Sequence, residues 1–140
     1  MSLDGAAVHA LTKEFYTQLA DLKVDKLYQP EKDEITLVLR GRNGSHRLTL
    51  SSSSSNPRAH FTKEAKRNPL SAPMFCMLLR KHLCGGRVVD VRQNGLERSI
   101  DFCIESYTEL GDLTVKHLII EIMGRYSNII LTEDDGRILD

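Results

Sequence analysis

The sequence EITLVLRGRNGSHRLTLS, residues 34–51, decides the fold class of this chain. Apolar residues alternate through residues 34–40. This alternation places Ile35, Leu37 and Leu39 on one face of a strand. Residues 41–44 read Gly-Arg-Asn-Gly, which is turn chemistry because Asn and Gly tolerate positive φ. A returning strand is expected over residues 47–51. The stretch therefore predicts an antiparallel β-hairpin.

The residues before this hairpin predict a helix and another strand. Apolar residues recur at four-residue spacing along the first segment, as in Leu3, Ala7, Leu11, Phe15 and Leu19. Ser2 or Asp4 can cap such a helix by accepting hydrogen bonds from the first-turn N–H groups. Residues 23–29 alternate as a short strand, which we expect Pro30 to end.

A second helix is predicted after residue 70. Ser71 is its expected cap, Pro73 fits the first turn, and the dipeptide Gly85-Gly86 ends it. Its buried side is expected to hold Met74, Phe75, Met77, Leu78 and Leu79. Between the hairpin and this helix lie a serine-rich loop, residues 51–57, and a basic stretch, residues 58–70, that we interpret as irregular.

The rest of the chain alternates strands and turns. Strands are expected over residues 87–93, 98–106, 114–123, 128–132 and from 138 onward, with hairpin signals at Asn94-Gly95 and Asp135-Gly136. The resulting class is α+β, an antiparallel β-sandwich of about eight strands flanked by two helices. The last predicted strand is cut at Asp140, so we expect residues 1–140 to be one domain, the N-terminal part of a longer multidomain protein.

Composition excludes several classes of protein. The chain has 140 residues, of which 41% are hydrophobic and 27% charged, as in a globular domain. No apolar run approaches the roughly 18 residues of a membrane span, so no membrane partner is expected. The three cysteines form no close pair and the five histidines have no ligand spacing. We therefore predict reduced thiols, no disulfide framework, no metal and no cofactor.

Charge is distributed unevenly although its sum is zero. Residues 40–92 hold eleven Lys/Arg and two Asp/Glu, whereas residues 1–39 hold four and seven and residues 93–140 four and ten. Such asymmetry predicts a polyanionic partner for the middle segment. The alternative is that folding interleaves the three segments and neutralises the surface.

Five strings in order resemble the N-terminal (NFACT-N) domain of the fibronectin-binding-protein-A/RqcH/NEMF family. They are SLDG at residues 2–5, DKLYQP at 25–30, NPRAHFT at 56–62, PMFCMLLRKHL at 73–83 and EIMGRYSNIIL at 121–131. The resemblance implies a factor of ribosome quality control in the cytoplasm. Such a factor binds large ribosomal subunits carrying stalled peptidyl-tRNA and recruits tRNA, so that a C-terminal tail, polyalanine in bacteria, grows on the nascent chain. The alternative is an adhesin-type protein that binds fibronectin.

The same resemblance implies a fold similar to the N-terminal domain of formamidopyrimidine-DNA glycosylases. Those enzymes attack with the amine of an N-terminal proline next to a glutamate. Here Ser2 and Leu3 stand at those positions, and leucine cannot transfer protons. We therefore predict that the chain is not an enzyme.

The resemblance also implies functional residues. The family has an Asp-Arg pair after a Gln-x-Gly turn, which corresponds here to Glu97 and Arg98, and a Leu-Asp-Gly string that contains Asp4. Asp4 could instead serve only as a helix cap, and Glu97 with Arg98 as an exposed strand pair. Further candidates for nucleic-acid contacts are Arg58, His60, Lys63, Lys66, Arg67, Arg80, Lys81 and Arg125. The alternative for the residues from Arg58 to Arg67 is a solvated basic loop. Arg80 and Lys81 could instead complement the dipole at the C-terminal end of their helix, and Arg125 could belong to a structural bend.

Overall fold

The structure is a computed structural model of the 140-residue chain. It describes residues 5–42, 44–53, 58–63, 66–93, 98–122, 128–134 and 137–139.

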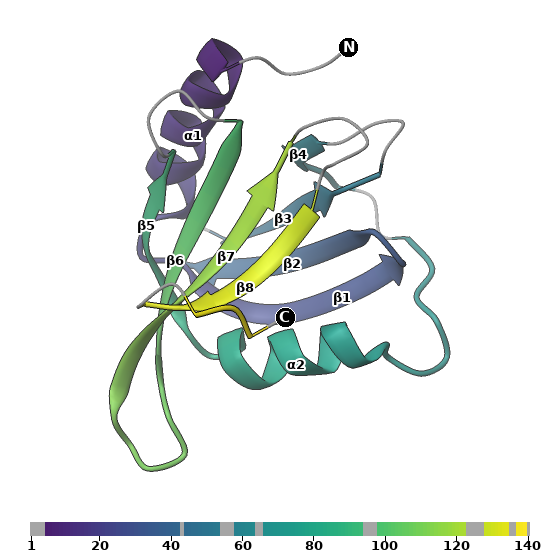
Figure 1. The fold of residues 1–140 in the computed structure, drawn as a ribbon, viewed down its shortest axis with the longest axis vertical. Coiled ribbons are helices and arrows are strands. Elements are labelled where there is room, and N and C mark those ends of the chain that lie inside the picture. Colours follow the sequence, from purple (N-terminus) through teal and green to yellow (C-terminus); the bar gives the residue numbers. More distant parts are fainter. Residues whose placement is uncertain are drawn as a thin grey trace.

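Within the described residues the chain forms two helices and eight strands (Figure 1). In chain order they are α1 (Gly5–Leu19), β1 (Lys23–Glu31), β2 (Glu34–Gly41), β3 (Gly44–Ser51), β4 (Arg58–Phe61), α2 (Met74–Leu83), β5 (Arg87–Arg92), β6 (Ser99–Tyr107), β7 (Leu113–Glu121) and β8 (Asn128–Glu133). This agrees with the predicted class of about eight antiparallel strands and two helices. The hairpin on which that prediction rested is β2–β3, with Gly41 opposite Gly44.

All strands pair antiparallel in the order β4-β3-β2-β1-β5-β6-β7-β8. The two halves meet at one narrow junction, where β1 pairs with β5 through Lys23 and Arg87. Figure 1 shows that the halves turn across each other there, so that β8 passes over β2 while α1 and α2 flank the sheet. Buried residues of both halves form one core, which gives the sheet the packing of a sandwich.

Phe15 of α1 lies at the centre of this core. Its ring meets Phe61 of β4 edge-on, with centroids 5.3 Å apart, and Phe102 of β6 at 5.7 Å. Phe15 therefore joins an edge strand of one half of the sheet to a strand of the other half. Phe15 and Leu19 are buried as the four-residue spacing predicted, although Val8 and Thr12, not Ala7 and Leu11, complete the buried face.

Several strand boundaries differ from those predicted. Residues 58–61, expected to be irregular, form the edge strand β4, because four residues are too short to show alternation convincingly. Pro30 does not end β1; it lies where the register shifts between Tyr28 and Glu31, a position that does not require a ladder N–H group. Ile138 forms only an isolated bridge with Thr132 instead of a strand.

Helix α2 also differs from its prediction. Its N-cap is Pro73 without a side-chain cap, not Ser71, and its buried residues are Cys76, Leu79 and Leu83. Met74 and Met77 are exposed, since a helix with 3.6 residues per turn cannot bury every member of a consecutive apolar run. Gly85, with φ of 86°, follows the C-cap as expected. Among the described residues, neither helix has the length and apolar character needed to cross a bilayer.

Candidate nucleic-acid interface

Arg98 lies immediately before β6 and its side chain is exposed. Its carbonyl oxygen accepts a hydrogen bond of 2.7 Å from the backbone N–H of Ile122, just beyond β7. Within the described part of the chain, no carboxylate forms an ion pair with its guanidinium. The sheet therefore holds the Arg98 backbone while the charged group remains available to a partner.

The region around Arg98 is one end of the sheet, which we call the rim: His9, Gln93, Arg98, Ile122 and Asn128. The His9 Nδ1 and Gln93 Oε1 atoms are 3.2 Å apart, which ties α1 to the end of β5. The rim continues across β6, β7 and β8, because Ser99 is paired with Glu121 and Glu121 is paired with Asn128. Figure 1 shows the start of α1, the start of β6 and the end of β7 toward this end of the molecule. Asp4, Glu97 and Arg125, which are also candidates from the sequence, lie outside the described residues.

A second group of candidates surrounds a buried carboxylate. Glu34, only 2% exposed, has its Oε1 atom 3.0 Å from Lys66 Nζ and 3.5 Å from an Arg58 Nη2 atom. The Arg58 Nε–H donates to His60 Nε2 at 3.0 Å, and His60 Nδ1 lies 3.1 Å from the Phe61 carbonyl oxygen. These contacts fit the tautomer with its proton on Nδ1.

The charges of this second group are already partly compensated. The hydrogen bond to Glu34 raises the pKa of Lys66, with further raising from the charges of Glu34 and Glu31 against a smaller desolvation effect. Lys66 also lies 3.5 Å from Glu31. Arg58 and Lys66 therefore hold a buried anion in place, a role the sequence did not reveal. Glu34 itself was missed because its partners Arg58 and Lys66 lie 24 and 32 positions along the chain, beyond any local spacing.

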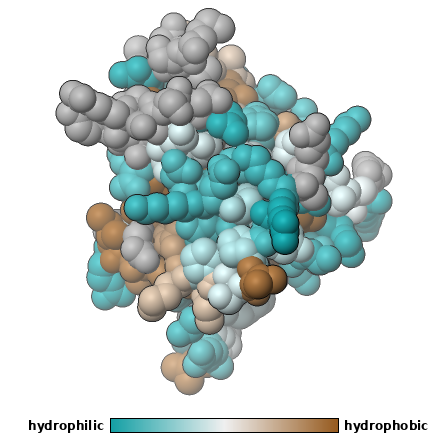
Figure 2. Space-filling model, turned by 90° about the vertical axis from the view of Figure 1, so that its right-hand side faces the viewer, coloured by the Kyte–Doolittle hydropathy of each residue, from teal (hydrophilic) through white to brown (hydrophobic). Residues whose placement is uncertain are grey.

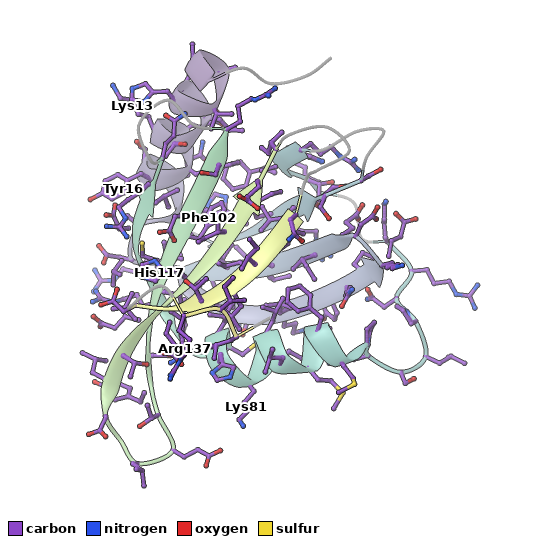
Figure 3. All side chains as sticks on the ribbon, in the orientation of Figure 1. Lys13, Tyr16, Lys81, Phe102, His117 and Arg137 are labelled. Atoms are coloured by element: carbon purple, nitrogen blue, oxygen red, sulfur yellow. The ribbon has the colours of Figure 1, made fainter. Side chains whose placement is uncertain are left out.

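Arg80 and Lys81 differ although they are neighbours on α2. The Arg80 Nε–H donates to the Leu27 carbonyl oxygen at 2.8 Å, and its guanidinium carbon lies 5.8 Å from the centre of the Tyr28 ring. Arg80 therefore joins α2 to β1 through a hydrogen bond and a cation–π contact. Lys81 is exposed and projects from the lower side of α2 into solvent (Figure 3).

Folding interleaves part of the basic middle segment with the acidic flanks. Ion pairs join Arg40 to Asp25 at 3.3 Å, Arg87 to Asp21 at 2.9 Å, and Arg92 to Asp101 at 3.3 Å. Neutralisation is incomplete, since six middle-segment cations form no ion pair among the described residues: Arg42, Arg47, Lys63, Arg67, Arg80 and Lys81. Figure 2, which faces the side carrying the segment between β4 and α2, shows a broad hydrophilic area with separate hydrophobic patches. Neutralisation by folding is therefore confirmed for part of the segment, and the polyanionic partner stays a prediction for the remaining cations.

The phenylalanine rings and the cysteine thiols lie in or against the core or are partly buried. Phe15 and Phe102 are buried, while Phe61 and Phe75 are partly buried and pack against the core, as predicted for core residues. The described cysteines are free, with Cys76 and Cys103 buried and Cys84 half-buried. Burial raises the pKa of Cys76 and Cys84, and raises that of Cys103 to about 12. Such protonated thiols are poor nucleophiles.

Fold and charge together define a small antiparallel β-sandwich with an exposed arginine on its rim and several further cations that have no ion pair within the part of the chain that the structure describes. The family model for NFACT N-terminal and middle domains matches residues 4–140, and the chain belongs to this family.

Two named relatives span bacteria and animals. The chain is 43% identical to the Rqc2 homolog RqcH of Bacillus subtilis over 133 residues, covering 95% of this chain and 23% of that protein. It is 31% identical to the ribosome quality control complex subunit NEMF of Mus musculus, covering 95% of this chain and 12% of that protein. The chain therefore spans about a quarter or less of these relatives.

Solved structures agree with the fold. The N-terminal part of the fibronectin/fibrinogen-binding protein from Streptococcus suis superimposes with a TM-score of 0.94 at 36% identity, over 99% of this chain and 52% of that one. The N-terminal domain of fibronectin-binding protein PavA from Streptococcus pneumoniae gives a TM-score of 0.93 at 33% identity, over 98% of this chain and 52% of that one. The fold predicted from sequence is thereby confirmed.

Proposed function

We propose that this domain is the tRNA-binding module of a cytoplasmic ribosome rescue factor. The factor binds large ribosomal subunits that carry stalled peptidyl-tRNA and recruits tRNA for C-terminal alanine tailing of the nascent chain. The domain acts by binding, while the ribosome supplies the peptidyl-transfer chemistry. The relatives named for ribosome quality control support the setting.

The observation that carries this proposal is the exposed guanidinium of Arg98 on an otherwise fixed backbone. An arginine can hold a phosphate through two parallel hydrogen bonds. A charge-assisted hydrogen bond of this kind contributes about 1.5–3 kcal/mol, or roughly ten- to a hundredfold in affinity. The cations without described ion pairs, including Lys63 and Arg67, add a sequence-independent attraction to the RNA backbone.

The test is Arg98→Ala in the 140-residue chain, with labelled tRNA binding measured at low and physiological salt. We expect affinity for tRNA to fall about ten- to a hundredfold while the melting temperature stays unchanged. Arg87→Ala is the matched control, because Arg87 begins β5 at the opposite end from Gln93 and is paired with Asp21 and Glu105. A lowered melting temperature with retained tRNA binding would assign Arg98 to the scaffold.

Glu97→Asp is the companion variant, because the family resemblance implies aspartate at this position. Retained or improved tRNA binding indicates that the carboxylate serves the family's role. Loss of binding indicates that this chain uses the longer glutamate side chain. Cosedimentation of the same variants with large ribosomal subunits then separates tRNA binding from ribosome binding.

The names of the solved structures favour a second candidate, binding to fibronectin. Immobilised fibronectin and labelled tRNA should be tested on the same protein preparations. The tRNA proposal expects Arg98→Ala to abolish most tRNA binding and to leave any fibronectin binding unchanged. Saturable fibronectin binding without tRNA binding favours the second candidate.

A further inference from the structure

A compact cluster of metal-ligand side chains lies on the outer face of β6 and β7. Asp101, Cys103 and His117 each place one ligand atom so that these atoms lie within 4.8 Å of one another. Asp101 and Cys103 are two residues apart on β6, so they share a face, and Cys103 is paired with His117 on β7. Figure 3 labels His117 beside β6 and β7, away from Phe102 in the core.

The distances from His117 Nδ1 to the other two ligands are close to those of a zinc site. Cys103 Sγ lies 3.5 Å from His117 Nδ1, and both Asp101 carboxylate oxygens lie 2.9 Å from the same nitrogen. Zinc bonds of about 2.3 Å to sulfur and 2.0 Å to nitrogen or oxygen give S···N and O···N separations of about 3.5 and 3.3 Å in a tetrahedron. The sulfur and nitrogen are thus already spaced for the ion, and the carboxylate needs to withdraw by only about 0.4 Å.

The other nitrogen of His117 has the partner that a metal-bound imidazole requires. His117 Nε2 lies 2.8 Å from Asp134 Oδ1, just beyond β8. Metal-ligating histidines almost always donate their second N–H to a carboxylate or carbonyl, which fixes the ring and its tautomer. With that proton on Nε2, the Nδ1 lone pair faces the Asp101 carboxylate and the Cys103 thiol. A cation at this point replaces lone-pair repulsion with coordination.

The surroundings leave one side of the cluster open. Cys103 and His117 are buried, whereas the Asp101 side chain is 23% exposed. Arg92 is the described cation that faces the cluster; its Nη2 lies 3.3 Å from Asp101 Oδ2, and its Nε lies 3.8 Å from Asp90. Asp101 Oδ1 stays available to an ion, and Asp90 and Asp134 supply further negative charge. Three protein ligands and one open position form a standard zinc arrangement.

We propose that Asp101, Cys103 and His117 bind a divalent transition-metal ion of the zinc class, with Asp134 orienting His117. Binding displaces the thiol proton of Cys103 to solvent as the metal–sulfur bond forms. The ion would tie β6 and β7 to the residue that follows β8. Histidine spacing along the sequence gave no sign of this site, because only strand pairing brings His117 opposite Cys103. The inference is independent of tRNA binding.

The test is titration of the metal-free 140-residue chain with Zn²⁺ and, separately, with Co²⁺ as a spectroscopic probe. We expect one bound equivalent, a higher melting temperature with zinc, and the near-ultraviolet charge-transfer band of a cobalt–thiolate bond. Cys103→Ser should abolish the band and lower zinc affinity at least about tenfold, whereas Cys84→Ser, which alters the half-buried cysteine after α2, should change neither.

Asp134→Asn is a second variant for the case in which Cys103→Ser unfolds. The Asp134 side chain is 73% exposed, so this substitution should leave the fold intact. It should lower zinc affinity about 10- to 100-fold with circular dichroism unchanged. The proposal is overturned if the unmodified chain gives no cobalt–thiolate band, or if the band persists in Cys103→Ser. In either case the cluster is an Asp–His–Asp hydrogen-bond chain without a metal.

Discussion

Lys66 Nζ lies 3.0 Å from Glu34 Oε1, and the carboxylate it meets is almost completely buried. Arg58 approaches the same oxygen at 3.5 Å. Two of the basic residues that the sequence suggests for nucleic-acid contact are therefore held by an internal anion. Their availability to phosphate depends on Glu34, because removing that charge takes one anionic partner from both cations, while Lys66 keeps Glu31 and Arg58 keeps His60.

Glu34→Gln should destabilise the fold and strengthen tRNA binding. The loss of stability is expected to be about 1–3 kcal/mol, because the charged groups facing a buried position lose their anionic partner. Urea denaturation and tRNA anisotropy measure the two effects. Glu14→Gln on the exposed surface of α1 makes the same change in charge and should leave stability unchanged. Weaker tRNA binding in Glu34→Gln would instead show that Glu34 orients Arg58 and Lys66 for their ligand.

Much of the fold could be predicted from local patterns. The alternation of Ile35, Leu37 and Leu39 with the Gly-rich turn predicted β2 and β3, since strand period and turn chemistry are properties of neighbouring residues. The four-residue edge strand β4 was not predicted, because its strand conformation depends on pairing with β3 and on the contact of Phe61 with Phe15. Tertiary contacts, not local propensity, decide such short strands.

Phe15→Ala should lower stability by about 3–5 kcal/mol, because this fully buried ring joins the two halves of the sheet. Phe15→Leu should be milder and should leave tRNA affinity unchanged, since the ring is a core group and not a platform for bases. Tyr16→Ala is the control on the same helix, with a side chain 47% exposed (Figure 3) and an expected effect within about 0.5 kcal/mol. The measurement is chemical denaturation, and equal effects at both positions would contradict the central role of Phe15.

The candidate site was harder to predict than the fold. Arg98 is exposed at the start of β6, whereas the Asn94-Gly95 turn predicted before it lies outside the described residues. In contrast, the sequence grouped Arg58, Lys66 and Arg80 with the cations open to a partner. In the structure Arg58 and Lys66 form ion pairs with Glu34, and Arg80 donates a hydrogen bond to the Leu27 carbonyl oxygen. A charge run shows where cations occur, but distant residues decide which of them are compensated.

His82 should make the fold less stable in mild acid. Burial lowers its pKa, and the charges of Lys116 and Lys81 lower it further against a smaller opposing effect of Glu133. Because the folded pKa lies below the unfolded value of about 6.5, the unfolded chain binds the proton more strongly. The contribution to stability is complete above the unfolded pKa and is lost as pH falls toward the folded pKa.

The check is the free energy of unfolding of His82→Gln and of the unmodified chain on both sides of the unfolded pKa. The unmodified chain should lose more stability on acidification than the variant. His9→Gln, at an exposed position of α1, provides the matched substitution and should keep the full acid sensitivity. An identical loss in His82→Gln and the unmodified chain would mean that His82 contributes nothing to it.

Lys63 and Arg67 should contribute more to tRNA binding than Lys66, which lies between them in the sequence. Lys63 and Arg67 are exposed and have no ion pair among the described residues, so a phosphate gains their full charge. Lys63→Gln or Arg67→Gln should each reduce the slope of log affinity against log salt by about one, with an unchanged melting temperature.

Lys66→Gln should instead lower the melting temperature, because Glu34 loses its nearest cation, and should change the salt slope less. Anisotropy titrations of the three variants over a range of salt concentrations compare them directly. If Lys66→Gln gives the largest change in slope, the Lys66–Glu34 pair opens in the complex and Glu34 acts as an internal competitor of phosphate. A slope unaffected by all three variants would place the RNA contact away from this side of the domain, at the rim that carries Arg98.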